Sequence, residues 1–283
     1  TAVNDAPVVA SISDQAIDED TTFEFEVSAT DVDGDTVTFD AAVNGNGSAS
    51  VDGSTLTVTP AADYNGNIEV TVTANDGELS DSQTFAVTVT PVNDAPVVDS
   101  IADQTVAEDT AFTLTLSASD VDGDAVSFSA SVDGNGSASV DGSTLTVTPA
   151  SDYYGNIEVT ISASDGTLAG TDSFTLNVTS VNDAPVIDAI TDQVIDEDSS
   201  LTLTLTASDV DGDVLTFSAT NGNADISIDG DVLTITPESN YNGEAEVTVQ
   251  VSDGEYASST TFTLTVNPVN DAPALSALAT GTV

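Results

Sequence analysis

The sequence predicts an all-β chain of three tandem Greek-key β-sandwich domains, each with about seven strands. Two observations favour this architecture: a recurring segment and short strand-like stretches between its copies. The segment Val-Asn-Asp-Ala-Pro starts at Val3, Val92, Val181 and Val269, so successive copies lie 89, 89 and 88 positions apart. That spacing suits a whole small domain and is too long for a repeat of one or two helices. We therefore expect repeats at residues 1–92, 93–181 and 182–270, with residues 271–283 as the beginning of a further repeat.

The strand-like stretches alternate apolar and polar residues. In the second repeat they cover residues 112–116, 125–128, 145–147, 157–161 and 174–178. A period of two with many β-branched residues is typical of strands that bury one face. Asp-Gly and Asn-Gly pairs between the stretches supply turns, and no stretch has the period of a helix. Turns roughly every 8–12 residues are typical of a Greek-key sandwich.

One tyrosine recurs in every repeat, two positions before a glycine, as Tyr64, Tyr153 and Tyr241. Its place at the start of a strand is similar to that of a tyrosine corner, in which the hydroxyl group bonds nearby backbone. We predict a packing role for it rather than a part in ligand binding.

Composition excludes several classes of function. The chain has no Lys, Arg or His and 49 Asp and Glu residues, which gives a formal net charge of −49. Such a polyanion repels nucleic acids and anionic membrane surfaces. Without His, Cys or Lys there is no usual general base, thiolate or Schiff-base residue. No apolar stretch is long enough for direct membrane insertion. The expected partner is a cation.

Acidic residues recur at the repeat spacing. In the second repeat they are Glu108, Asp120, Asp122 and Asp165, and each linker carries an Asn-Asp pair. Because loops of a sandwich alternate between its two ends, we expect carboxylates from two successive repeats to meet at the linker between them. A solvated turn remains the alternative for any single Asp-Gly pair.

The donor set favours Ca²⁺ over Mg²⁺. All the candidate ligands are oxygens, many are available, and their geometry is flexible, which suits calcium, whereas Mg²⁺ requires a strict octahedron. A linker filled with calcium would be stiff, and an empty one would be flexible.

The order of these motifs resembles that of a known family. Ala118-Ser-Asp-Val-Asp-Gly, then Asp165-Gly, then Val181-Asn-Asp-Ala-Pro is similar to the signature of cadherin repeats. The chain looks most like the bacterial cadherin-like tandem repeats of large secreted adhesins and biofilm matrix proteins. The resemblance covers nearly the whole chain and implies cadherin-like or Ig-like sandwiches with calcium bound between successive repeats.

The resemblance also implies the ligands. At the first linker they are Glu19, Asp63, Asn93, Asp94, Asp120, Asp122 and Asp165. At the second linker they are Glu108, Asp152, Asn182, Asp183, Asp209, Asp211 and Asp253. Half-sites at the two outer ends comprise Asn4, Asp5, Asp31, Asp33 and Asp76, and Glu197, Asn270 and Asp271.

Two departures from the cadherin pattern lower the expected number of ions. Cadherins carry Asp-x-Glu before the sixth strand, whereas this chain has Asp63-Tyr-Asn, Asp152-Tyr-Tyr and Asn240-Tyr-Asn. The linker is also one residue shorter than in cadherins and lacks its second Asn. We expect two ions at each linker where cadherins hold three.

These observations lead to three functional hypotheses. The first is a calcium-rigidified extracellular stalk of a bacterial cell-surface adhesin or secreted matrix protein, whose partners are calcium ions and neighbouring repeats. The near identity of residues 45–59 and 134–148 fits a spacer lengthened by duplication. The second is a self-assembling filament, joined through edge strands or through the terminal residues 1–2 and 274–283.

The third hypothesis is ligand binding or catalysis. Paired carboxylates can hydrolyse glycosides, and sandwiches that bind sugars usually expose aromatic platforms. The chain has no Trp and only five Tyr, three of which are assigned to corners. We therefore predict that it is not an enzyme.

Overall fold

The computed structural model describes residues 3–271, which form strands and turns and contain no helix. A membrane-spanning helix is accordingly absent from this part of the chain. The expected stub at 271–283 and both chain ends lie outside the described residues, apart from Asp271.

Each repeat contains nine strands, two of which have only two residues. In the first repeat they are β1 (Val8–Val9), β2 (Gln15–Asp18), β3 (Phe23–Glu26), β4 (Ala29–Thr30), β5 (Thr38–Val43), β6 (Gly47–Asp52), β7 (Thr55–Pro60), β8 (Gly66–Asn75) and β9 (Ser80–Thr90). In the second they are β10 (Val97–Val98), β11 (Gln104–Ala107), β12 (Phe112–Thr115), β13 (Ala118–Ser119), β14 (Ser127–Val132), β15 (Gly136–Asp141), β16 (Thr144–Pro149), β17 (Gly155–Ser164) and β18 (Ala169–Thr179). In the third they are β19 (Val186–Ile187), β20 (Gln193–Asp196), β21 (Leu201–Thr204), β22 (Ala207–Ser208), β23 (Thr216–Thr220), β24 (Ala224–Asp229), β25 (Val232–Pro237), β26 (Gly243–Ser252) and β27 (Ala257–Asn267).

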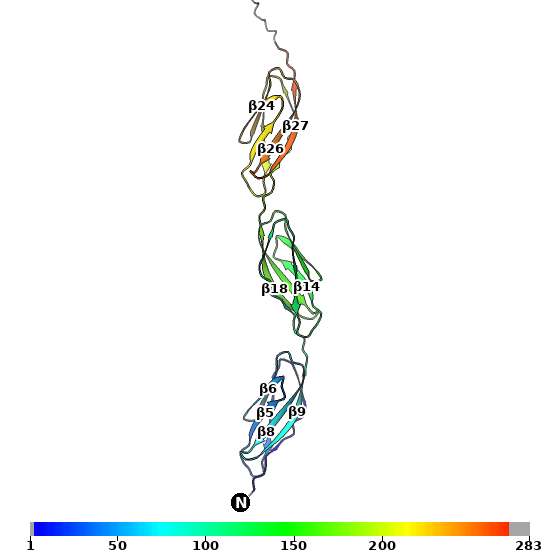
Figure 1. Ribbon diagram of the computed structural model, residues 1–283, viewed down its shortest axis with the longest axis vertical. Helices are drawn as coiled ribbons and strands as arrows, with labels where there is room; N and C mark the ends of the chain where they lie inside the picture. The colour runs from blue at the N-terminus through cyan, green and yellow to red at the C-terminus, as the bar shows by residue number, and fades with distance from the viewer. Residues whose placement is uncertain (1–2, 272–283) are drawn as a thin grey trace, which may run out of the picture. The chain divides into compact units, whose positions relative to one another are not determined.

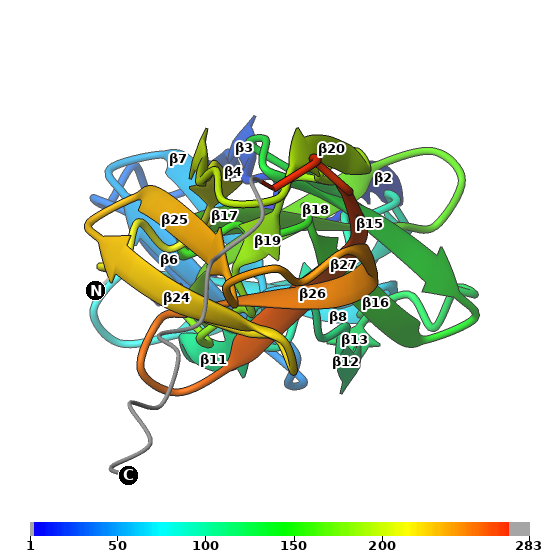
Figure 2. The ribbon, with the colours of Figure 1, turned by 90° about the horizontal axis from the view of Figure 1, so that it is seen from above.

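The strands of the first repeat form two sheets and one short pair. The larger sheet has the order β2-β9-β8-β5, the smaller has β3-β7-β6, and β1 pairs with β4. The other repeats have the same order with their own strands. The long hairpin strands β8 and β9 run side by side in Figure 1, as do β26 and β27 in Figures 1 and 2.

One pairing within the larger sheet is parallel. Strand β2 lies parallel to β9, with Gln15 opposite Val87 and Asp18 opposite Thr90. Before β2 the chain forms the separate short pair of β1 with β4, and it enters the larger sheet at β2.

Inward-facing side chains of both sheets form the core. In the first repeat Leu56 and Val58 of β7 face Ile68 and Val70 of β8, and all four are fully buried. Their outward-facing neighbours along each strand are Thr, Asn and Glu, as the period of two predicts. An equivalent core in the third repeat is built around Leu233, Ile235 and Leu264.

The expected all-β sandwich architecture is confirmed, with seven longer strands in each repeat and two two-residue additions. Strand limits differ from the sequence prediction. Residues 125–126 precede β14 rather than belonging to it, because the pairing with β17 starts at Ser127. Strands β11 and β15 are absent from the predicted stretches, because their segments Gln-Thr-Val-Ala and Gly-Ser-Ala-Ser have weak apolar alternation. Strands β17 and β18 are about twice as long as predicted, since residues with weak apolar alternation, such as Ser162, Ala163 and Ser164, continue the hairpin.

The recurring tyrosine forms a hydrogen-bonded corner. The Tyr64 hydroxyl donates to the Asn67 carbonyl at 3.1 Å, and Tyr153 and Tyr241 bond the carbonyls three positions ahead at 3.0 and 2.9 Å. Gly66 permits this contact, because a Cβ there would lie 2.8 Å from the Tyr64 hydroxyl and the residue has a φ of 136°.

The chain divides into two compact units. The first comprises Thr1–Gln104, Phe112–Val147 and Ile157–Leu176, and the second comprises Thr105–Ala111, Thr148–Asn156 and Asn177–Val283. Each linker falls in the same unit as the loops that surround it, so each linker site is described within its own unit.

Candidate metal centres at the linkers

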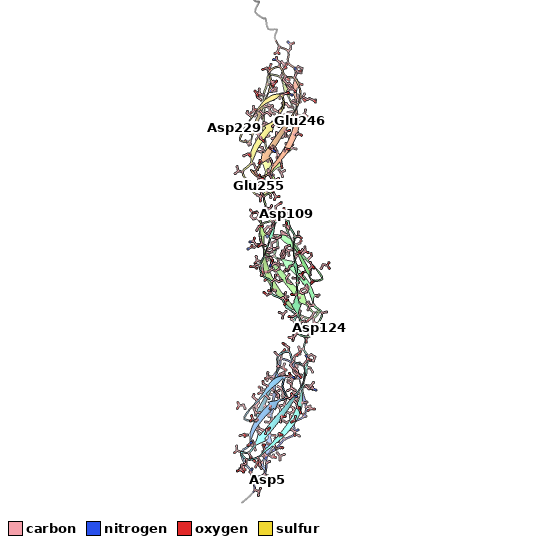
Figure 3. The ribbon with its side chains drawn as sticks, viewed as in Figure 1. Asp5, Asp109, Asp124, Asp229, Glu246 and Glu255 are labelled. Carbon is pink, nitrogen blue, oxygen red and sulfur yellow. The ribbon has the colours of Figure 1, made fainter. Side chains whose placement is uncertain are left out.

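Acidic side chains occur on strands and in turns throughout the structure. Glu246 lies on β26, Asp229 ends β24, and Glu255 belongs to the turn between β26 and β27 (Figure 3). Single exposed carboxylates of this kind are solvated and indicate no metal site. Compact groups of three carboxylates are found, within the described residues, only around the two linkers.

The first linker is fixed by hydrogen bonds to the loops of the second repeat. The Asn93 Nδ2 donates to Asp165 Oδ2 at 2.7 Å, and the backbone N–H of Asp94 donates to Asp122 Oδ2 at 2.8 Å. Both acceptors come from Asp-Gly turns that the sequence places far apart. The linker therefore brings two loops of the second repeat to one point.

The first repeat contributes a buried carboxylate. Glu19 follows β2 and is only 3% exposed. Its Oε1 accepts the N–H of Val92 at 2.7 Å, while its own N–H donates to the Thr90 carbonyl at 3.0 Å. A buried carboxylate is costly unless hydrogen bonds or cations compensate it.

The Asp120 side chain organises its own loop and leaves one oxygen unused. Its Oδ1 accepts the N–H groups of Asp122 and Asp124 at 3.1 and 3.2 Å. Its Oδ2 is buried and has no partner within the described structure, and the same is true of the equivalent oxygens of Asp31 and Asp209. Asp183 Oδ2 at the second linker is also buried and unpartnered. Buried polar atoms are normally satisfied, so these oxygens are open to a cation.

Five carboxylates around the first linker form two groups that share Asp94. Within each group the nearest oxygens lie within 4.8 Å of one another. One group is Glu19, Asp94 and Asp122, and the other is Asp20, Asp63 and Asp94.

The second linker repeats this arrangement. Its groups are Glu108, Asp183 and Asp211, and Asp109, Asp152 and Asp183. Asn182 Nδ2 donates to Asp253 Oδ2 at 2.9 Å, and the Asp183 N–H donates to Asp211 Oδ2 at 2.8 Å. The Glu108 side chain, 3% exposed, accepts the Val181 N–H at 2.6 Å.

The loops that hold the second group have an unusual backbone conformation. Asp20 and Asp63 have φ values of 57° and 55°, and Asp109 and Asp152 have 57° and 56°. In each pair the second residue donates its N–H to the first carboxylate, at 3.2 Å for Asp63 and 3.3 Å for Asp152. Asp and Asn adopt this left-handed region more readily than other non-glycine residues. Residues held there often cluster at functional sites.

The pKa shifts of the linker aspartate Asp94 and of the turn aspartate Asp165 have opposite directions. Partial burial, and after it repulsion from neighbouring carboxylates, raises the pKa of Asp94 and likewise that of Asp183. By contrast, the hydrogen bond from Asn93 and the backbone N–H groups of its turn lower the pKa of Asp165. The linker aspartate is thus the member whose negative charge the surroundings do not balance.

The two outer ends contain the remaining candidates. At one end Asn4 Nδ2 donates to Asp76 Oδ2 at 3.0 Å, the Asp5 N–H donates to Asp33 Oδ2 at 2.8 Å, and Asp31 Oδ1 accepts three loop N–H groups. No group of three carboxylates forms there among residues 3–271.

At the other outer end, Glu197 is 7% exposed and accepts the Val269 N–H at 2.6 Å. Here Asn240 replaces the aspartate of the other repeats, and Asn242 Nδ2 approaches Glu197 Oε2 at 3.5 Å. Asn270 Nδ2 bonds the Asp271 carbonyl.

The sequence prediction omitted Asp20 and Asp109 from the ligand set. Their recurrence after Glu19 and Glu108 was visible, but only the structure places them beside Asp63 and Asp152. The signal that could have found them is the repeated Glu-Asp pair, of which both members face the linker.

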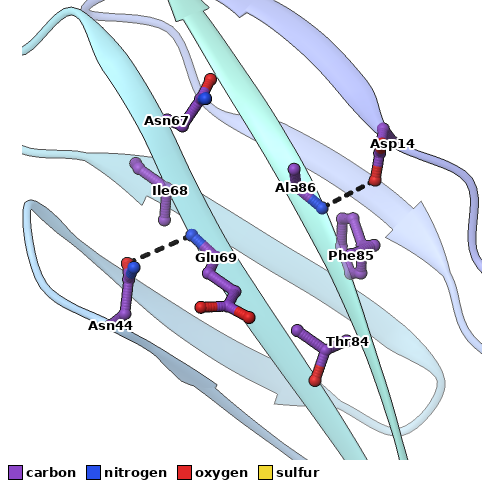
Figure 4. A pocket seen from close by; sticks show the side chains of 8 residues that line it. All are labelled: Asp14, Asn44, Asn67, Ile68, Glu69, Thr84, Phe85 and Ala86. Atoms are coloured by element: carbon purple, nitrogen blue, oxygen red, sulfur yellow. Dashed lines mark hydrogen bonds between the residues drawn. The ribbon is translucent and has the colours of Figure 1, made fainter.

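A separate hollow of about 350 Å³ lies on the outer face of the larger sheet in the first repeat (Figure 4). Asp14 Oδ1 there accepts the Ala86 N–H at 2.9 Å, and Asn44 Oδ1 accepts the Glu69 N–H at 3.1 Å. These side chains hold backbone in place, so their role is structural.

The fold and the linkers together define a protein of tandem Ig-like β-sandwich domains with acidic linkers. The sequence profile described as "Bacterial Ig domain" matches residues 4–90, 93–179 and 182–267. The chain therefore belongs to the bacterial Ig domain family. The predicted cadherin-like repeats are thus confirmed as tandem Ig-like repeats.

A curated relative shares part of the sequence. Chitinase A of Pseudoalteromonas piscicida is 35% identical over 111 residues, which cover 38% of this chain and 14% of the relative. The chain therefore spans only a small part of that enzyme.

Solved structures also align with most of this chain at low sequence identity. Drosophila N-cadherin EC1-4 is 15% identical, with a TM-score of 0.43, and the alignment covers 95% of this chain and 76% of that one. An endo-fucoidan hydrolase from glycoside hydrolase family 107 is 19% identical, with a TM-score of 0.30 and coverages of 94% and 45%. The chain spans less than half of that hydrolase.

Proposed function

We propose that this chain is a calcium-stabilised extracellular spacer of a longer bacterial surface or matrix protein, with calcium bound at each linker. One observation carries the proposal: Asp94 and Asp183 each belong to two groups of carboxylates, in a chain without a single Lys, Arg or His. No Lys, Arg or His side chain is available to neutralise these groups, which supports a bound polyvalent cation.

The donor set supports calcium as that cation. Every side-chain donor is a carboxylate or amide oxygen, and Ca²⁺ takes 6–8 such ligands with flexible geometry, as a general rule. The shared aspartates support two ions at each linker, bridged by Asp94 or Asp183. Glu19 and Glu108 would supply buried charge to one ion, and the unpartnered oxygens of Asp120 and Asp209 support further ligation from the following repeat.

Calcium at the linker would join two successive repeats, because its ligands come from both. Extracellular calcium modules typically bind with a Kd of about 10⁻⁴ to 10⁻³ M. At millimolar calcium the linker would be ordered, and without calcium the carboxylates would repel one another. A stiffened spacer is the consequence.

A catalytic role has no support. Ig-like repeat domains are typically non-enzymatic, and the carboxylate groups gather around the linkers. The match to a stretch of chitinase A supports an extracellular location, and it also supports the use of such repeats as connecting modules. A role in surface adhesion or in a biofilm matrix is consistent with this use.

Small-angle scattering together with calorimetry tests the proposal. We expect millimolar CaCl₂, and not MgCl₂, to shift the chain from a flexible to a stiff profile in scattering, with heat of binding over the same concentration range. The double variant D94A/D183A should lose both effects. Replacement of an acidic residue outside the linkers, D141A, is the matched control. An identical profile in calcium and in chelator would overturn the proposal.

A further inference from the structure

Two tyrosines outside the corners are exposed. Tyr154 is 58% exposed and Tyr256 is 46% exposed, and neither hydroxyl makes a hydrogen bond within residues 3–271. The corner tyrosines, by contrast, all donate to backbone carbonyls. The aromatic rings of Tyr154 and Tyr256 are thus free to contact a ligand.

Both tyrosines flank the second linker. Tyr154 follows Asp152 by two positions, and Asp152 belongs to the carboxylate group of Asp183. On the other side, the Tyr256 N–H donates to Asp253 Oδ1 at 2.6 Å, and Asp253 Oδ2 accepts from the Asn182 side chain at 2.9 Å. The backbone of Tyr256 and the loop of Tyr154 are therefore placed beside the adjacent linker residues Asn182 and Asp183.

This aromatic pair is specific to the second linker. The equivalent positions at the first linker hold Asn65 and Leu168, although the carboxylate groups of the two linkers match residue by residue. The tyrosines consequently add something that cation binding does not need.

We propose that the second linker binds a neutral polysaccharide, with sugar rings stacked on Tyr154 and Tyr256. Exposed aromatic rings offer an apolar face to the C–H groups of a sugar ring and a polar hydroxyl at the edge. Carboxylates beside the rings, including that of the exposed Glu255, accept hydrogen bonds from sugar hydroxyls. A net charge of −49 repels sulfated and uronic acid polymers, which selects a neutral glycan.

The chain contains its own controls for this proposal. Y154N and Y256L introduce the residues that it already carries at equivalent positions, so both variants are compatible with the fold. V32S removes an exposed apolar side chain in the first repeat (80% exposed), away from the second linker, and serves as the negative control. N65Y/L168Y transfers the tyrosine pair to the first linker.

Affinity electrophoresis tests the proposal directly, because the acidic chain migrates well in native gels. The gels contain hydroxyethyl cellulose, laminarin or galactomannan as neutral polymers and alginate as an anionic one, each in calcium and in chelator. We expect retardation by at least one neutral polymer and none by alginate. Y154N and Y256L should each weaken binding about two- to tenfold, the effect of losing one aromatic stacking contact, and V32S should not. On the neutral polymer that retards the parent chain, N65Y/L168Y should bind more tightly than that chain.

Three results would overturn the proposal: no retardation by any neutral polymer, retardation by alginate alone, or unchanged binding in Y154N/Y256L. The proposal does not rest on calcium, since stacking on each ring needs no cation. The chelator arm therefore keeps a failure of sugar binding separate from a failure of the calcium sites.

Discussion

The side chain of Asn93 donates a 2.7 Å hydrogen bond to the carboxylate of Asp165, 72 positions further along the chain. Asn182 makes the same contact with Asp253 at 2.9 Å, and Asn4 with Asp76 at 3.0 Å. The amide orients one carboxylate of each repeat towards the preceding linker segment. The linkers are thus preorganised by polar contacts that the chain supplies itself.

Replacing Asp94 by Ala should abolish cation binding at the first linker and leave the second intact. Both carboxylate groups of the first linker contain this residue, so its removal breaks both. Isothermal titration with CaCl₂ should show that the variant binds about half as many ions as the parent chain. Two of the four carboxylate groups contain Asp94 and lose it. Unchanged capacity and affinity would contradict the assignment, and D141A provides the comparison.

Replacing Glu108 by Gln should separate the effect of the side chain's charge from that of its packing and hydrogen bond. The Gln side chain keeps an oxygen that can accept the Val181 N–H, now bonded at 2.6 Å, but it carries no charge. We expect calcium affinity at the second linker to fall by at least about tenfold, a loss found even for partners outside the ligand shell.

Without calcium, the free energy of unfolding of E108Q should equal or exceed that of the parent chain, because a buried charge is removed. Chemical denaturation in chelator measures this, with E158Q on the exposed face of β17 as the control. A less stable variant in chelator would mean that the Glu108 charge is already compensated within the protein.

In the absence of calcium, lowering the pH should stabilise the first linker. The pKa of Asp94 is raised above its ordinary value of 3.8, by partial burial first and then by neighbouring carboxylates. A raised pKa means that this group contributes stability below 3.8, which is lost as pH rises through the higher folded-state pKa. In chelator, the backbone amides around the first linker should therefore become more protected from hydrogen exchange as pH falls from the raised pKa of Asp94 towards 3.8.

Calcium binding should show the opposite trend, because protonation removes a ligand charge. The calcium affinity should decline as pH falls towards the raised pKa of Asp94, and titrations from neutral to acidic pH would measure this. D94N should respond less to pH in both experiments. Equal pH dependence in D94N and the parent chain would assign the effect to other carboxylates.

The corner tyrosines should contribute measurable stability. Y64F removes the hydroxyl that donates to the Asn67 carbonyl at 3.1 Å and leaves the ring in place. We expect a loss of about 0.5–1.5 kcal/mol in the free energy of unfolding of the first repeat, the usual net value of one hydrogen bond. Y154F, whose hydroxyl has no bonded partner among the described residues, should be neutral in the same denaturation experiment. If Y64F has the same free energy of unfolding as the parent chain, the hydrogen bond of the tyrosine corner does not contribute to stability.

Much of the architecture could be predicted from sequence because its signals are local. Alternation along residues 112–116 and 157–161 predicts strands, and Asp-Gly pairs predict turns, since both depend on a few neighbouring residues. The parallel pairing of β2 with β9 could not be predicted in the same way, because it joins segments about 70 positions apart and no local pattern specifies it.

The linker groups show the same limit. Recurrence identified Glu19 and Asp94 as candidates, but not Asp20, whose proximity to Asp63 follows from two left-handed backbone turns. Tyr154 likewise has no sequence signal of its own, because it adjoins Tyr153, which has a clear structural role. Adjacent residues can differ in function when one side chain points into the corner and the next points to solvent.

The parallel pair β2 and β9 also has a mechanical consequence. These strands stand near the beginning and the end of the first repeat, and β20 and β27 hold the same positions in the third. Tension applied to the two ends of a repeat would pull such strands in opposite directions along their length. Their backbone hydrogen bonds then bear load together in shear instead of opening one at a time. Resistance to stretching is thus built into the sheet of each of these repeats, separately from whatever occupies the linkers.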